Sequence, residues 1–192
     1  MSLQEELLSF ASSVGDMFRR RVAETPDGLA FLDPDRAPEG PNRWTRYTWA
    51  ESRLLVDQLA AGLLARGLAR EQRVGIISTT RLEWILLDLA VACAAGATTT
   101  VYPNTAAGDV EFILDDSGTC IVVVEDATQL AKVEASPTLR AAVHTIVVID
   151  TAHVELNDRV ISYTQLQLLG AELLKQNPGV VDEAIASTDH DT

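Results

Sequence analysis

The sequence predicts an α/β fold in which a mostly parallel sheet carries helices on both faces. The first observation is a set of short runs rich in β-branched residues, at 73–78, 97–102, 119–124 and 145–149. The second is that segments with apolar residues at helical spacing follow these runs, at 82–95, 106–116 and 127–135. Apolar strands that alternate with helices are typical of a parallel sheet buried on both faces. Residues 44–150 are therefore expected to form a βα-repeat core.

Residues 1–43 are expected to form an N-terminal helix followed by a short hairpin. Apolar residues at helical spacing predict the helix over residues 7–24. It should end before Pro26, because a residue that precedes proline avoids the helical conformation. The hairpin is predicted to consist of strands at 29–32 and 43–47 and a turn rich in Pro, Asp and Gly at 33–42.

Thr48 and Glu51 form a capping-box pattern, in which a hydroxyl and a carboxylate satisfy the first free N–H groups of a helix. The helix that they open is predicted over residues 50–65. It should end at Gly67, since glycine readily takes the left-handed conformation that is common after a helix.

A second capping box is predicted at Thr80 and Glu83, at the start of the helix over residues 82–95, which Gly96 should end. This helix is apolar nearly all round, which indicates burial between the sheet and other structure. Its Trp84, like the Trp residue that starts the preceding helix, is expected to pack in the core rather than to stack on a ligand.

Residues 151–192 are expected to form a peripheral region. A short strand is predicted at 161–163 and a helix at 164–174, and residues 176–192 are acidic and predicted to be a loop. The sequence contains no run of Gly with Ser, Thr and Lys, the pattern whose N–H groups and cation surround phosphates.

The composition indicates a globular chain and disfavours nucleic acid as a partner. Hydrophobic residues make up 47% and charged residues 22% of the sequence, and 28 acids against 15 bases give a formal net charge of −13. Such a chain repels a polyanion. The one basic cluster, Arg19 to Arg21, is expected to be a solvated helix face, with peripheral contact to a membrane surface as the alternative.

Cys93 and Cys120 lie in apolar stretches and are expected to be small buried hydrophobes, without a disulfide. No CxxC or HxxH spacing accompanies them, so no metal site is expected. The most apolar run, residues 84–95, is interrupted by Asp88 and is too short to span a bilayer. With no signal peptide apparent, we expect a soluble, cytoplasmic protein.

Ligands of parallel sheets tend to lie beyond the carboxyl ends of the strands. There the sequence places three loops, at 78–81, 102–105 and 125–127. In the first, hydroxyl groups and Arg81 either meet an anion or cap the next helix, and we favour capping. In the second, Asn104 and Thr105 either line the mouth of a pocket or cap the next helix, and both interpretations stay open. The third carries two acids, which argues against direct phosphate contact.

No arrangement of residues typical of catalysis is present. There is no Gly-x-Ser-x-Gly elbow and no Gly-x-Gly-x-x-Gly that opens a helix after a strand. Asp115 and Asp116 are neighbours on a helix, so their carboxylates point apart, and we expect a solvated helix end. We therefore assign no catalytic residue.

An ordered series of short segments resembles the N-terminal part of long-chain fatty acyl-CoA synthetases, which are AMP-binding enzymes of the adenylate-forming superfamily. The segments are Tyr47-Thr48-Trp49, Arg73 to Ile76, Arg81 to Trp84, Ala95 to Ala97 with Tyr102-Pro103, Asp116 to Gly118, and Val123 to Asp126. The sequence departs from the family at Thr80, where the family usually has Asn, and at Asn104-Thr105, where it favours Thr-Ser. These departures leave the acyl substrate and its chain length open.

The resemblance implies the fold of part of an adenylate-forming N-terminal domain, and a two-step reaction. A fatty acid carboxylate attacks the α-phosphate of Mg·ATP to give an acyl-adenylate, and the thiol of coenzyme A (CoA) then displaces AMP. In the family, the groups that stabilise these charges lie in a Gly-rich loop and in a C-terminal domain that would follow Thr192. We therefore expect no cofactor in this chain and no activity from it alone.

The resemblance also implies candidate binding residues and partners. Some relatives contact CoA from segments that match residues 102–105 and 127–132, which places Asn104, Thr105 and Lys132 at a CoA-facing edge. Lys132 is expected at the surface, so its replacement should change stability little. The partners implied are the remainder of the synthetase chain, the fatty acid and CoA, with a homodimer left open.

Two alternatives to a synthetase fragment stay open. In the first alternative, the chain is a stand-alone α/β module that binds a small ligand. In the second, it is an interaction protein that pairs with a full-length synthetase.

Overall fold

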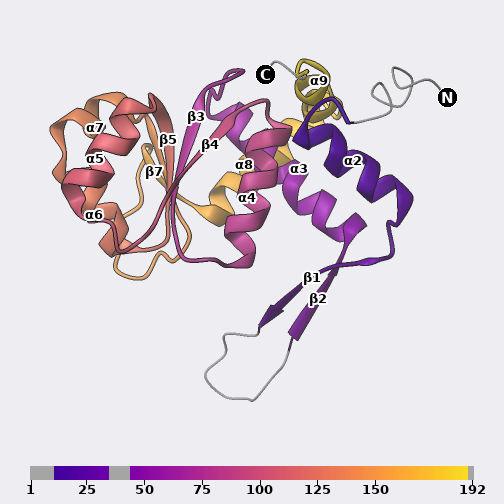
Figure 1. Ribbon diagram of the computed structural model, residues 1–192, viewed down its shortest axis with the longest axis horizontal. Helices are drawn as coiled ribbons and strands as arrows, with labels where there is room; N and C mark the ends of the chain where they lie inside the picture. Colours follow the sequence, from indigo (N-terminus) through magenta and orange to yellow (C-terminus); the bar gives the residue numbers. More distant parts are fainter. Residues whose placement is uncertain (1–10, 35–43, 190–192) are drawn as a thin grey trace, which may run out of the picture.

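A five-stranded parallel sheet forms the centre of the computed structural model, which describes residues 11–34 and 44–189 (Figure 1). The strands stand in the order β4-β3-β5-β6-β7, and each neighbouring pair is parallel. They are β3 (Arg73–Ile77), β4 (Ala97–Val101), β5 (Thr119–Val124), β6 (Thr145–Val148) and β7 (Val160–Ser162). The predicted α/β class is confirmed.

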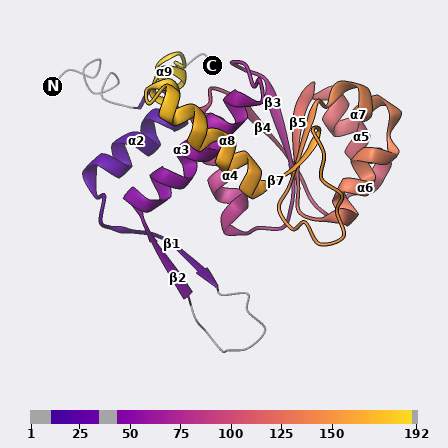
Figure 2. The ribbon, with the colours of Figure 1, turned by 180° about the vertical axis from the view of Figure 1, so that it is seen from behind.

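Helices cover both faces of this sheet, as Figures 1 and 2 show from opposite sides. One face carries α2 (Val14–Glu24), α3 (Trp49–Ala65), α4 (Leu82–Cys93), α8 (Tyr163–Gln176) and α9 (Val180–Ala186). The other carries α5 (Ala107–Asp116), α6 (Ala127–Ala135) and α7 (Pro137–Ala142). Each layer has its own buried apolar cluster.

The central strand β5 explains why its sequence is apolar along its whole length. Ile121 and Val123 pack into the cluster beneath α3 and α4, whereas Val122 and Val124 pack into the cluster beneath α5 and α6. Successive side chains of a strand point to opposite faces, and here both faces are buried. A strand with one solvated face would show alternation instead.

The N-terminal helix is shorter than predicted over the described residues. α2 begins at Val14, because the Ser13 hydroxyl accepts a hydrogen bond from the Asp16 N–H at 3.2 Å and caps it there. It ends at Glu24, as Pro26 predicted. Residues 7–10 of the predicted helix lie outside the described residues.

The hairpin strands are confirmed as β1 (Leu29–Pro34) and β2 (Trp44–Thr48), which pair antiparallel and extend away from the body of the molecule (Figure 1). The turn predicted between them lies, from residue 35 to 43, outside the described residues.

The first capping box is confirmed at the start of α3. The Glu51 N–H donates to Thr48 Oγ1 at 3.2 Å, and the Thr48 N–H donates to Glu51 Oε2 at 2.8 Å. After α3, Gly67 takes a φ of 87°. The Leu68 N–H donates to the Leu63 carbonyl at 3.0 Å, which completes a Schellman motif.

The second capping box is wrong. Arg81 stands at the N-cap of α4 without a side-chain cap, and Glu83 pairs with the Arg81 guanidinium instead. An ion pair with two short hydrogen bonds competes successfully with the weaker capping interaction. At the other end, the residue with positive φ is Ala95, at 59°, rather than Gly96. Gly96 is closely packed, since a Cβ there would lie 3.1 Å from a Leu68 methyl group and 3.2 Å from the Gln72 carbonyl oxygen.

The apolar surface of α4 follows from its position. α4 contacts α2, α3 and α9 as well as β4, so little of it faces solvent, as the sequence predicted. Within the described parts of the chain, no helix combines the length and apolar character needed to cross a bilayer.

Over the described residues, two short helices were not predicted. α7 follows Ser136, whose hydroxyl accepts from the Leu139 N–H at 3.1 Å. α9 lies where a loop was expected, because the buried Val181 and Ile185 give the acidic segment one apolar face. Asp182 and Glu183 in its first turn interact favourably with the helix dipole.

The expectation that Arg19 to Arg21 form a solvated face is wrong for Arg19. Only 14% of its side chain is exposed, and its guanidinium pairs with Asp57 at 2.6 Å and Asp182 at 2.9 Å. It therefore ties α2 to both α3 and α9. Arg20 pairs with Asp16 at 2.9 Å, and Arg21 lies over the Trp49 ring at 5.2 Å.

Candidate functional site

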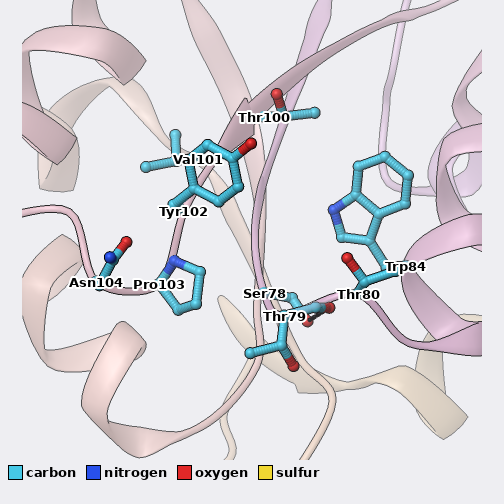
Figure 3. Close-up of a pocket in the computed structure, with 9 residues that line it drawn as sticks. All are labelled: Ser78, Thr79, Thr80, Trp84, Thr100, Val101, Tyr102, Pro103 and Asn104. Carbon is cyan, nitrogen blue, oxygen red and sulfur yellow. Dashed lines mark hydrogen bonds between the residues drawn. The ribbon is translucent and has the colours of Figure 1, made fainter.

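A cavity of ≈590 Å³ opens at the carboxyl ends of β3 and β4, between the loops that follow these strands. Figure 3 shows the lining residues: Ser78, Thr79, Thr80, Trp84, Thr100, Val101, Tyr102, Pro103 and Asn104. They offer hydroxyl groups, one carboxamide and aromatic rings, and none of these described lining residues is charged. The cavity therefore suits a polar, uncharged part of a ligand better than a phosphate group.

Two aromatic side chains lie on this cavity. Trp84 stands in the first turn of α4, where it packs against the buried cluster and also lines the cavity. Trp84 thus packs against the core, as expected, but it also contributes to the wall of the cavity. Tyr102 directly follows β4 and is 80% exposed.

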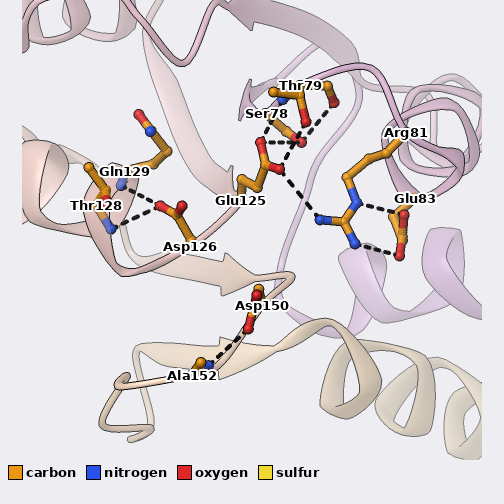
Figure 4. A network of polar contacts seen from close by, with 10 residues as sticks. All are labelled: Ser78, Thr79, Arg81, Glu83, Glu125, Asp126, Thr128, Gln129, Asp150 and Ala152. Atoms are coloured by element: carbon orange, nitrogen blue, oxygen red, sulfur yellow. Dashed lines mark hydrogen bonds and ion pairs between the residues drawn. The ribbon is translucent and has the colours of Figure 1, made fainter. Parts of the chain in front are cut away.

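The loop after β3 is held by Glu125, which directly follows β5 (Figure 4). Glu125 Oε2 accepts a hydrogen bond from the Thr79 N–H at 2.7 Å, and Oε1 accepts from the Thr79 hydroxyl at 2.8 Å. The Ser78 hydroxyl lies 3.4 Å from Oε2. Burial raises the pKa of Glu125, but the bonds from Thr79 and the charge of Arg81 outweigh it, so that the pKa is lowered.

Arg81 completes this network. Its guanidinium donates to both carboxylate oxygens of Glu83, at 2.7 and 2.8 Å, and lies 3.6 Å from Glu125 Oε1. Only 10% of the side chain is exposed. The favoured interpretation of the loop at 78–81 as a helix cap is therefore wrong, and the charge of Arg81 is balanced within the protein.

The loop after β4 is held by Lys132 of α6. Its ammonium group donates to the carbonyls of Pro103 at 2.6 Å and Thr105 at 2.9 Å. Lys132 is a partly exposed residue, and both of these contacts join it to the neighbouring loop. Two short bonds from a cation to backbone carbonyls fix the path of this loop.

The structure thus brings the three candidate CoA-edge residues together. Asn104 is exposed and lines the cavity, Thr105 is half-buried beside it in the chain, and Lys132 bonds to the Thr105 carbonyl. Neither Thr105 nor Lys132 is among the lining residues. Ala106 is the N-cap of α5, and no side chain in the described parts of the chain caps this helix, so capping by Asn104 or Thr105 is wrong.

The third loop serves α6. The Asp126 carboxylate accepts from the N–H groups of Thr128 at 2.9 Å and Gln129 at 3.0 Å, which caps the helix.

Sequence reasoning assigned no structural role to Glu125. Its position could have indicated this role. Glu125 is an acid directly after an apolar strand, at the end of the sheet where the neighbouring loop carries N–H and hydroxyl donors.

Metal binding and cysteine chemistry have little support among the described residues. No three His, Cys, Asp or Glu side chains within those ranges gather closely enough to hold a metal ion. Cys93 and Cys120 are unpaired cysteines, as expected. Cys93 is buried, whereas Cys120 is only partly buried, so the expectation of burial is wrong for Cys120. Burial raises the pKa of the Cys93 thiol to about 12, which makes it a poor nucleophile.

Comparisons with known proteins point in one direction. A family model described as AMP-binding enzyme matches residues 18–184. The chain is 35% identical over 101 residues to the long-chain-fatty-acid–CoA ligase FadD15 of Mycobacterium bovis, covering 50% of this chain and 17% of that protein. It is 32% identical over 118 residues to the long-chain-fatty-acid–CoA ligase heimdall of Drosophila melanogaster, covering 62% and 17%.

A solved structure of the N-terminal domain of FACL13 from Mycobacterium tuberculosis shares the fold. The TM-score is 0.62 at 21% identity, over 94% of this chain and 37% of that chain. Against the two sequence relatives, the aligned part of the chain spans about a sixth of their length.

Proposed function

This chain belongs to the AMP-binding enzyme family, and from that premise we propose that it is the N-terminal part of an ATP-dependent long-chain fatty acid–CoA ligase. The whole enzyme would join a fatty acid to AMP, with release of pyrophosphate, and then pass the acyl group to the CoA thiol. The observation that carries the proposal is the family match over residues 18–184, together with two long-chain ligases among the relatives.

The described residues supply only part of such a site. Both steps develop negative charge, which cations and N–H donors must stabilise. The cavity at β3 and β4 is lined by uncharged residues, and the nearby Arg81 is paired with two carboxylates. The groups that stabilise ATP and its magnesium ion would therefore come from the remainder of a synthetase chain, which is the partner we propose.

We place the CoA-facing edge at Asn104, Thr105 and Lys132. The Asn104 carboxamide offers both a donor and an acceptor at the cavity. An ammonium group has three N–H donors, and Lys132 gives two of them to loop carbonyls. The third is suited to a carbonyl or phosphate oxygen of CoA at the edge of the cavity.

The activity is tested by ATP–pyrophosphate exchange with a long-chain fatty acid. We expect no exchange above the control without fatty acid, because the described site offers ATP phosphates no unpaired cation beyond Lys132. Measurable exchange by this chain would contradict the assignment of the catalytic groups to another part of the enzyme.

The CoA edge is tested by isothermal titration with CoA. Asn104→Ala should weaken binding by about fivefold or more, the effect of one lost hydrogen bond. Thr138→Ala is the matched control, since Thr138 is exposed on α7 and outside the cavity. Equal affinities for the two variants would contradict the placement of the edge.

A further inference from the structure

Three of the cavity residues, Ser78, Thr79 and Thr80, are consecutive in one loop. This loop is joined to β5 through Glu125 in two ways. The backbone N–H of Glu125 donates to the Ile77 carbonyl at 2.9 Å, which ties the end of β5 to the end of β3. Its carboxylate then accepts from both the N–H and the hydroxyl of Thr79. One side chain therefore fixes the backbone and the side chain of the central loop residue.

Glu125 is itself held in place. Arg81 lies 3.6 Å from its Oε1 and is immobilised by the two bonds to Glu83. The side chains of Arg81 and Glu125 are only 10% and 20% exposed, so solvent screens this pair weakly. Arg81 also offsets the repulsion between two nearby carboxylates.

We propose that Glu125 is a positioning residue for the cavity and that Arg81 supports it. By accepting hydrogen bonds from both the N–H and the hydroxyl of Thr79, Glu125 holds the hydroxyls of the loop in one arrangement before a ligand arrives. A ligand then need not order the loop, and binding is stronger for that reason. The identity of the ligand as CoA rests on the proposed function, whereas the order of the loop does not.

Amide hydrogen exchange measured by NMR on the whole chain tests the order of the loop directly. In Glu125→Ala, we expect the Thr79 amide to exchange about tenfold faster or more, the size of effect that a lost hydrogen bond to a charged group gives. The amide of Val123, within β5, should keep its rate, since it reports global opening. Glu155→Ala is the control, because Glu155 is an exposed carboxylate.

Two results would overturn the proposal. An unchanged Thr79 rate in Glu125→Ala would mean that the carboxylate does not order the loop. An equal acceleration at Thr79 and Val123 would mean that Glu125 only stabilises the fold. If Glu125→Ala does not fold, Arg81→Lys replaces it: it keeps the charge but loses the two-pronged bond to Glu83, and should raise the Thr79 rate by a smaller factor.

Titration with CoA on the same variants separates this proposal from the proposed function. Weaker CoA binding by Glu125→Ala, about fivefold or more, with unchanged binding by Glu155→Ala, would support both. A wild-type chain that binds no CoA while Thr79 exchange responds to Glu125 would reject CoA as the ligand and keep the positioning role. Unchanged CoA affinity in a variant whose Thr79 amide exchanges faster would overturn the link between loop order and binding.

Discussion

At the scale of single residues, the two loops around the cavity are held by side chains of opposite charge. Glu125 accepts hydrogen bonds from the N–H and the hydroxyl of Thr79, and Lys132 donates hydrogen bonds to the carbonyls of Pro103 and Thr105. A carboxylate can only accept and an ammonium can only donate, so each loop requires its own sign of charge. Both side chains come from the β5–α6 unit, which therefore holds both loops.

The anchoring role of Lys132 predicts a loss of stability that a surface lysine would not show. Lys132→Ala should lower the free energy of unfolding in urea by about 1–3 kcal/mol, because two carbonyls lose a charged donor. Lys175→Ala is the control. Its side chain is 74% exposed and pairs with Glu172 at 3.2 Å, so a change within about 0.5 kcal/mol is expected. Similar losses in both variants would contradict the anchoring role.

The two cysteines should differ in reactivity. Cys93 is fully buried, and burial raises its pKa to about 12 despite the opposing influence of Arg19. Cys120 is half-buried. In Cys120→Ser, we expect no reaction of Cys93 with Ellman's reagent at pH 8 until guanidinium chloride unfolds the chain, since only the thiolate reacts. Fast reaction of the folded variant would show that Cys93 is accessible.

At the scale of elements, α8 is placed by direct backbone contact with α3. A Cβ on Gly170 would lie 1.7 Å from the Gln58 carbonyl oxygen and 2.6 Å from the Gly62 nitrogen. A Cβ on Gly62 would lie 2.3 Å from the Leu166 carbonyl oxygen. Glycine is needed at both positions for space. This close crossing buries Leu166 and fixes α8 after the edge strand β7.

The crossing predicts contrasting effects for two Gly→Ala changes. Gly170→Ala should destabilise the chain by about 3 kcal/mol or more in urea unfolding, because backbone atoms of α3 cannot move aside cheaply. Gly108→Ala is the control, since a Cβ added there on α5 would have no atom of another element within 4 Å. It should be neutral or stabilising by up to about 1 kcal/mol. A mild effect of Gly170→Ala would mean that the helices can separate.

At the scale of the whole molecule, charge is the dominant property. The formal net charge is −13 and the sequence pI is about 4.5. Several of the 15 bases are already committed to ion pairs, among them Arg19, Arg81 and Arg159. The excess carboxylates therefore repel one another across the folded chain, and this repulsion destabilises the compact state.

The net repulsion predicts how stability responds to salt. Raising NaCl from about 0.01 M to about 0.1 M shortens the Debye length from about 30 Å to about 10 Å, so repulsion between distant carboxylates weakens. At pH 7 the Tm should rise over this range. Near pH 4.5, where the net charge is close to zero, the rise should disappear. A Tm that falls with salt at pH 7 would mean that ion pairs such as Arg19–Asp57 outweigh the repulsion.

The candidate site was only partly predictable. The rule that ligands lie beyond the carboxyl ends of parallel strands led to the loops at 78–81 and 102–105, and both line the cavity. The role of Glu125 was missed, because it depends on Thr79, which lies 46 residues away in the chain. Arg19 was misjudged for the same reason, since Asp182 lies 163 residues away.

The sequence by itself determined the sheet, the larger helices and their alternation. These follow from local properties, such as the β-branched run of β5 and the capping box at Thr48, which act within a few residues. Only the tertiary structure decided that Glu83 pairs with Arg81 instead of capping α4, that α9 is a helix, and that Lys132 holds the loop beside Asn104. The last two depend on which distant groups become neighbours when the layers pack on the sheet. Arg81 and Glu83 are only two residues apart, and their pairing instead reflects an ion pair that is stronger than a helix cap.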